Sequence, residues 1–208
     1  MENNNLIAII DYGVGNLFSL TSSLKYIGAK SVVTGDAEKI KSADKIILPG
    51  VGAFGDAAKA LKKTGLDEII AAEAAGGKPL MGICLGMQLL YEKSFEYGEH
   101  KGLGLIPGTI SPLADFLEDK SLKVPHMGWN SLVFAQKNHQ LLKYVNEHSF
   151  VYYVHSFFAP VSEHTAAYSG YGNVNITGIC AKGNVVGTQF HPEKSGETGL
   201  NILRAFTE

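Results

Sequence analysis

Short apolar runs alternate with helix-like segments through the first half of the chain. Residues 6–11, LIAIID, are typical of a buried strand, and apolar positions then recur at helical spacing across residues 17–27. The later strand-like runs are residues 31–35, 45–50 and 78–83. Repeated strand–helix steps of this kind predict an α/β fold in which helices flank a central, mostly parallel sheet.

The second half is richer in β-branched and aromatic residues, and Gly, Pro, Asn and Ser separate its short runs. The strand-like segments include residues 150–158, 176–183 and 184–190. This texture is typical of strands joined by turns, so we expect antiparallel strands here. Ser195 is expected to cap a last helix, whose apolar face carries Leu200, Leu203 and Phe206. We expect one domain over residues 1–208.

Composition argues against several classes of protein. The net charge is −2 and no long run has one sign, so neither a nucleic-acid-binding surface nor a basic membrane patch is indicated. No apolar run approaches the ~20 residues that cross a bilayer. The amino-terminal MENNN lacks the positive segment of a secretory signal. We therefore expect a cytoplasmic protein that binds neither nucleic acid nor membrane.

Cys84 stands at a corner flanked by glycines, in GICLG at residues 82–86. G-x-C-x-G is the thiol counterpart of the nucleophile elbow, a sharp strand-to-helix turn that projects a reactive side chain. Such a turn needs positive φ, which costs roughly 1–3 kcal/mol, and neighbours without side chains relieve the crowding. The Leu85 N–H would then be positioned to receive an oxyanion. A buried cysteine in an ordinary turn is the alternative.

A second segment, TQFHPEKS, favours the catalytic interpretation. An apolar strand leads to His191, and Glu193 follows beyond the rigid Pro192. Glu193 can hold the imidazole in the tautomer that accepts the thiol proton. His191 alone would equally suit a surface histidine, but both segments together favour a Cys-His-Glu triad. Cys180 has no glycine corner and no charged neighbour, so we expect it to pack on a strand.

A glycine-rich loop, LPGVGAFGD, follows another predicted strand. It lacks the Walker pattern, so phosphate binding is weakly supported. Gly50 and Gly52 better suit a loop that offers backbone N–H groups to the same oxyanion as Leu85, although a plain turn would also use glycine. The seven histidines form no HExxH or Cys/His cluster, so we expect no metal and no cofactor.

Three of these stretches, LPGVGAFG, GICLGMQ and FHPEKS, resemble class I glutamine amidotransferases. The resemblance covers almost the whole chain, and VPHMGWN and YYVHSF narrow it to the glutaminase subunits of imidazole glycerol phosphate synthases. It implies a flavodoxin-like core and glutamine hydrolysis by Cys84, His191 and Glu193. It also implies a heterodimer with a (β/α)₈ cyclase, which would use the ammonia to make imidazole glycerol phosphate and aminoimidazole carboxamide ribotide in histidine biosynthesis.

The resemblance also implies roles for other residues. They are Gly52 and Leu85 for the oxyanion, Gln88, Glu96 and the backbone of Ser156 and Phe157 for glutamine, and Asn16, Tyr152 and Lys194 for the partner. Gln88 lies one turn after Cys84, so it faces the same way. Glu96 lies in a charged loop, where a solvated side chain is the alternative. Tyr152 would equally suit an aromatic core.

Three other functions are compatible with these motifs. A paralogous glutaminase would supply ammonia to a sugar-amidinating or other synthase, although PHMGWN favours the cyclase. A cysteine hydrolase on the same sheet would need an open cleft and no partner. A non-catalytic regulatory module would be expected to lack one of Cys84, His191 and Glu193, and all three are present.

Overall fold

An eight-stranded sheet organises the computed structural model, which describes residues 5–208. Its strands in spatial order are β2 (Lys30–Thr34), β1 (Leu6–Ile10), β3 (Lys45–Leu48), β4 (Leu80–Ile83), β14 (Val185–Thr188), β13 (Val174–Lys182), β12 (Thr165–Tyr171) and β9 (Val133–Phe134). Strands β2 to β14 pair in parallel and the last three pair antiparallel. The order β2-β1-β3-β4-β14 is the flavodoxin-like order, so the predicted fold class is confirmed.

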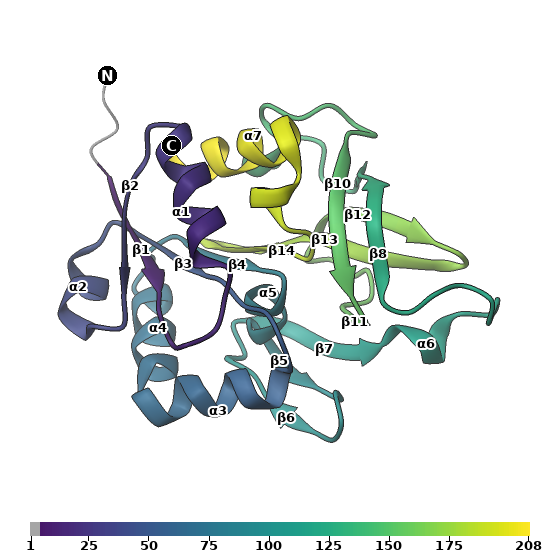
Figure 1. The fold of residues 1–208 in the computed structure, drawn as a ribbon, viewed down its shortest axis with the longest axis horizontal. Helices are drawn as coiled ribbons and strands as arrows, with labels where there is room; N and C mark the ends of the chain where they lie inside the picture. Colours follow the sequence, from purple (N-terminus) through teal and green to yellow (C-terminus); the bar gives the residue numbers. More distant parts are fainter. Residues whose placement is uncertain (1–4) are drawn as a thin grey trace.

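Helices cover both faces of this sheet (Figure 1). They are α1 (Leu17–Tyr26) and α7 (Gly196–Thr207) on one face, and α3 (Phe54–Thr64) and α4 (Leu66–Ala75) on the other. Strand β1 contributes Ile7 and Ile9 to the cluster under α1 and α7, and Ala8 and Ile10 to the cluster under α3 and α4. Burial on both faces explains why this strand is uniformly apolar.

Two smaller sheets hold the rest of the second half. One contains β11 (Phe157–Phe158), β7 (Ile106–Pro112), β5 (Tyr91–Ser94) and β6 (His100–Lys101), and the other pairs β10 (Phe150–His155) with β8 (His126–Ser131). The short helices are α2 (Ala37–Ser42), α5 (Leu85–Leu89), α6 (Leu113–Phe116), and the 3₁₀ turns η1 (Gln140–Leu142) and η2 (Pro192–Lys194). The aromatic and β-branched segments of this half are strands, as the sequence predicted.

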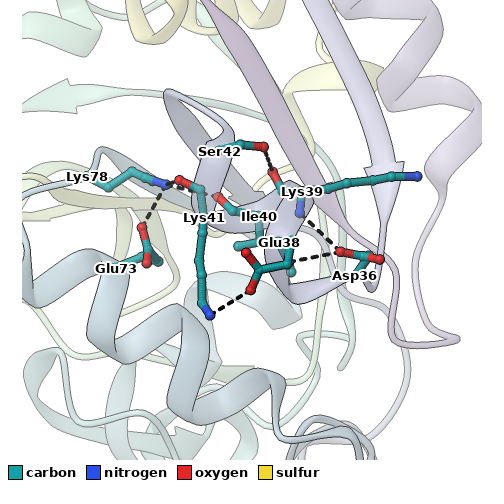
Figure 2. A network of polar contacts seen from close by, with 8 residues as sticks. All are labelled: Asp36, Glu38, Lys39, Ile40, Lys41, Ser42, Glu73 and Lys78. Atoms are coloured by element: carbon teal, nitrogen blue, oxygen red, sulfur yellow. Dashed lines mark hydrogen bonds and ion pairs between the residues drawn. The ribbon is translucent and has the colours of Figure 1, made fainter.

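Polar contacts hold the two ends of α2 (Figure 2). Asp36 caps α2, accepting two backbone N–H groups of its first turn. At the other end, the Lys78 ammonium donates to the carbonyls of Ile40 and Lys41 at 2.9 and 2.7 Å and pairs with Glu73 at 2.7 Å. Lys78 comes just before β4, so these bonds anchor the strand that leads to Cys84.

The expectation that Ser195 caps the last helix with its side chain is wrong. Helix α7 begins at Gly196 without a side-chain cap. The Ser195 hydroxyl instead donates to the His191 carbonyl at 2.6 Å and accepts the Tyr152 N–H at 2.9 Å. The hydroxyl is therefore used to fasten the His191 corner to β10. Of the residues predicted to face inward, Leu203 and Phe206 are buried and Leu200 is half-buried.

Within residues 5–208, no helix is long and apolar enough to cross a membrane. Residues 1–4, which carry most of the segment considered for a secretory signal, lie outside the described residues.

Candidate active site

Cys84 occupies the sharp turn between β4 and α5. Its φ is +54°, so the predicted strained corner is confirmed. A Cβ added to Gly82 would lie 2.6 Å from the Gly86 carbonyl oxygen, and one added to Gly86 would overlap the Leu48 carbonyl oxygen. Both glycines are therefore required by close backbone approach, which brings the Cys84 turn against the end of β3.

The adjacent strands β3, β4 and β14 end at one edge of the sheet, beside a pocket of about 320 Å³. The predicted site residues that line this pocket are Gly52, Cys84, Leu85, Gln88, Glu96, Ser156, Phe157 and His191. Gly50 and Glu193 lie behind it, around a smaller cavity that His191 also lines. A larger cavity of about 550 Å³ lies among α3, α4 and β6 and is lined by no cysteine, so size alone would not locate the site.

His191 joins Cys84 to Glu193. Its Nδ1 lies 2.8 Å from Glu193 Oε1, and each of these side chains is 3% exposed. Glu193 can only accept when ionised, so Nδ1–H donates and Nε2 is the ring nitrogen left for the sulfur. Burial alone would lower the pKa of His191, but hydrogen bonds and charge attraction from Cys84 and Glu193 raise it to about 9. A protonated ring beside a cysteine favours the thiolate.

The glycine-rich loop packs directly on this corner. A Cβ on Gly50 would lie 2.7 Å from the Gly86 nitrogen, and Gly52 has φ of +92°, a value open to glycine at little cost. The buried Tyr12 hydroxyl donates to the Pro49 carbonyl at 2.8 Å and so holds the entrance of the loop. The loop and Leu85 thus share one wall of the pocket.

Glu96 and Gln88 are both held inside the molecule. Glu96 is only 8% exposed and accepts the Phe54 N–H at 2.6 Å, so the alternative of a solvated side chain is wrong. Gln88 Nε2 donates to the Phe157 carbonyl at 2.9 Å and to Gln189 Oε1 at 3.1 Å. Gln88 therefore connects α5, the helix that follows Cys84, to the backbone at Phe157.

Sequence reasoning missed Gln189, which contacts both Gln88 and Cys84. It is fully buried, and its Nε2 lies 3.9 Å from Cys84 Sγ. Its signal is a long polar side chain at the end of an otherwise apolar strand, directly before Phe190 and His191. His155, which also lines the pocket, was missed as well.

The residues predicted to face a partner lie at different depths. Lys194 is exposed, while Asn16 and Tyr152 are half-buried. Tyr152 packs edge-on against the exposed Trp129, with ring centroids 5.9 Å apart, so it is not the core aromatic.

Cys180 is buried on β13 as predicted, and burial raises its pKa to about 12. No group of three potential metal-binding side chains occurs among residues 5–208.

Two buried histidines beside the site should make the free energy of unfolding depend on pH. Burial lowers the pKa of His126 to about 4, while burial and the neighbouring His126 lower that of His155 to about 3. Histidine in an unfolded chain takes up a proton near pH 6.5, so the unfolded state binds more protons below that pH. The free energy of unfolding is therefore not reduced by these rings above about pH 6.5. As the pH falls towards 4 it decreases, by up to about 1.4 kcal/mol per pH unit for each ring.

Urea unfolding at pH 7, 6 and 5 measures this loss. His126→Asn should show a shallower decline of unfolding free energy than the parent, because one of the two rings no longer titrates. A decline of equal steepness in both proteins would contradict the assignment of neutral, buried rings.

The family follows from comparison with known proteins. The family model Glutamine amidotransferase class-I matches residues 8–208. The chain belongs to the class-I glutamine amidotransferases. Among solved structures, PurLQS from Thermotoga maritima aligns with 97% of each chain at a TM-score of 0.74 and 22% identity. The glutaminase domain of CTPS from Trypanosoma brucei aligns at a TM-score of 0.68 and 14% identity, covering 98% of this chain and 94% of that one.

Curated relatives narrow the comparison within that family. The chain is 48% identical over 205 residues to the imidazole glycerol phosphate synthase subunit HisH of Oceanobacillus iheyensis, covering 98% of both proteins. It is 50% identical over 202 residues to the HisH subunit of Bacillus cereus, covering 97% of this chain and 93% of that one.

Proposed function

We propose that this chain is the glutaminase subunit of an imidazole glycerol phosphate synthase and forms one glutaminase domain. The similarity to HisH subunits over nearly the whole chain is the observation that carries the proposal. Contact between Cys84 and His191 at one end of a small pocket supports amide hydrolysis at that site. A reactive thiol and two free cysteines suit a reducing compartment, so we also propose a cytoplasmic location.

The proposed chemistry is nucleophilic amide cleavage. Cys84 Sγ attacks the side-chain carboxamide carbon of glutamine, and the carbonyl oxygen becomes an oxyanion facing the N–H groups of Leu85 and Gly52. The C–N bond breaks, and His191 gives its proton to the departing nitrogen, which leaves as ammonia. Water then attacks the thioester with His191 as base, which releases glutamate and restores the thiol. Glu193 orients the ring throughout.

The pocket suits a free amino acid rather than an extended peptide. A buried carboxylate, Glu96, supplies the charge that an ammonium group needs, and Gln88 with the backbone near Phe157 supplies polar partners for the other groups. The volume of about 320 Å³ is at the lower end of the usual range for small-ligand pockets. Both features disfavour the peptidase alternative.

Ammonia should pass to a (β/α)₈ cyclase partner in a heterodimer, and docking should control the reaction. Exposed Met127 and Trp129 on β8, near Tyr152, support a partner surface on this side. Glutamine hydrolysis without the cyclase would waste ammonia. We therefore propose that a peptide group in the loop from Gly50 to Gly52 turns on docking and completes the oxyanion hole, a change that glycine permits cheaply.

Glutamate release decides this proposal. It should be measured with the chain alone, with the cyclase, and with the cyclase and its nucleotide ligand, and the rate should be highest in the last case. Release at the full rate by the isolated chain would contradict gating. No release under any of the three conditions would contradict the proposed function.

Glu96→Gln should raise the KM for glutamine roughly tenfold or more, because a charged hydrogen bond contributes about 1.5–3 kcal/mol. The amide oxygen can still accept the Phe54 N–H, so the loop beside it should keep its shape. Glu99→Gln is the matched control, since Glu99 is exposed in the same segment and pairs with Lys93. Equal KM values for the two variants would exclude Glu96 from substrate binding.

A further inference from the structure

Two buried histidines link β8 to the wall of the pocket. His126 Nδ1 lies 3.0 Å from His155 Nε2, and His155 Nδ1 lies 3.0 Å from the Phe157 carbonyl oxygen. At the other end, Asn130 Nδ2 lies 3.3 Å from His126 Nε2. The two rings are 4% and 6% exposed. Strands β8 and β10, which carry them, pair side by side (Figure 1).

Only one arrangement of protons satisfies all three contacts with neutral rings. The Phe157 carbonyl can only accept, so His155 Nδ1 carries a proton and His155 Nε2 accepts. His126 Nδ1–H must then be the donor to His155, which leaves His126 Nε2 to accept from the Asn130 amide. The donors therefore all point from Asn130 towards Phe157. Neutral rings also avoid an unpaired buried charge.

The His126 ring has little freedom to leave this arrangement. It stacks on Tyr153 with centroids 4.8 Å apart and lies 4.2 Å from the Tyr171 ring. Tyr153 is itself fully buried, and its hydroxyl lies 2.9 Å from the Ser169 hydroxyl. Packing on both sides thus holds the imidazole where its N–H meets His155.

The chain of hydrogen bonds ends at the carbonyl of Phe157, a residue that lines the pocket. The Phe157 carbonyl receives two donors, His155 Nδ1–H at 3.0 Å and Gln88 Nε2 at 2.9 Å. Gln88 comes from the helix of the nucleophile, whereas His155 comes from β10. The carbonyl of Ser156, next to it, accepts the Leu113 N–H at 2.9 Å. The peptide groups on the two sides of Phe157 are therefore both held by hydrogen bonds.

We propose that His126 and His155 are positioning residues for substrate: they fix the orientation of the Ser156–Phe157 backbone, and with it the part of the pocket that receives the amino-acid end of glutamine. This inference rests on the proposed function. Neither ring takes part in bond breaking. The pair acts on glutamine binding, so its loss should raise KM while leaving kcat nearly unchanged.

Two substitutions at His126 separate hydrogen bonding from packing. Asn places an amide N–H near the position of Nδ1 and can still donate to His155, whereas Leu fills a similar volume without a donor. In the complex with the cyclase, H126L should raise the KM for glutamine roughly three- to tenfold, with kcat within about twofold of the parent. H126N should restore most of the affinity. H139L is the control, because His139 is partly buried and lines a separate cavity that shares no residue with the pocket.

Equal KM values for H126L and H139L would overturn the proposal, and so would an H126N variant as impaired as H126L. Synthesis from added ammonia should proceed normally in every variant, and its loss in H126L would indicate a damaged complex instead of a positioning role. If the parent complex releases no glutamate, the proposed function fails. Side-chain nitrogen NMR of the chain then still tests the arrangement of protons in the histidine pair. Protons on Nδ1 of both rings support the proposal, and protons on Nε2 overturn it.

Discussion

Replacing Cys84 by Ala should abolish glutamine hydrolysis while leaving ammonia-dependent synthesis by the complex intact. Loss of the nucleophile should lower the glutamine-dependent rate by roughly 10⁴-fold or more, because the remaining residues cannot form the thioester. The hydrogen bond and charge of Cys84 also help to raise the pKa of His191 to about 9, so that pKa should fall in the variant. Glutamate release, synthesis from ammonium salts and NMR titration of His191 measure the three effects.

Cys180→Ala is the matched control, because the second thiol is fully buried on β13 outside the pocket. It should keep glutamine-dependent activity. Glutamate release by Cys84→Ala at a rate near that of the parent would show that another group attacks the amide. Loss of the ammonia-dependent reaction would show instead that the substitution damaged the complex.

Gly86→Ala should destabilise the protein by at least about 3 kcal/mol. The added methyl group would overlap the Leu48 carbonyl oxygen, which is backbone and cannot swing away as a flexible side chain would. The end of β3 and the nucleophile turn would have to separate, so activity should fall with stability. For a chain of 208 residues this loss corresponds to a fall in Tm of roughly 6–12 °C.

Gly76→Ala tests whether any glycine substitution would do the same. Gly76 has φ of −72°, and an added Cβ would meet its nearest neighbours at 3.4 and 3.5 Å, which is ordinary contact. Its stability should change by no more than about 1 kcal/mol. Thermal unfolding of both variants decides the matter, and a Gly86→Ala protein as stable as Gly76→Ala would contradict the close packing of β3 on the turn.

Local patterns were enough to predict the parallel half of the fold. The strand residues 6–10 and 80–83 carry no polar side chain because both faces of these strands are covered, and residues 17–27 keep a helical period. The segment around Glu96 was predicted less well. It looks like a charged loop, yet β5 pairs with β7 and β6, and the carboxylate turns inward to the start of α3. The contact between Glu96 and Phe54 joins residues 42 positions apart, so it leaves no local signal.

Some features of the candidate site were likewise predictable from the local sequence, and others were not. The strained turn at Cys84 was predictable because Gly82 and Gly86 stand beside it in the chain. Contacts such as Gln189 with Gln88, or Tyr12 with Pro49, arise only when strand ends from distant parts of the sequence meet. Ser195 shows the opposite error, because a residue suited to capping was instead used by tertiary contacts with Tyr152 and His191.

The central claim is that Cys84 Sγ is the atom that attacks glutamine, in a pocket that His191 completes. A glutamine-shaped chloroketone, which alkylates a nucleophile held beside the carboxamide site, tests it most directly in the complex with the cyclase. We expect one label per chain, on the peptide that contains Cys84, forming in step with the loss of glutaminase activity and slowed by glutamine. Inactivation with the label on any other residue, or full labelling of Cys84 with glutaminase activity retained, would contradict the account.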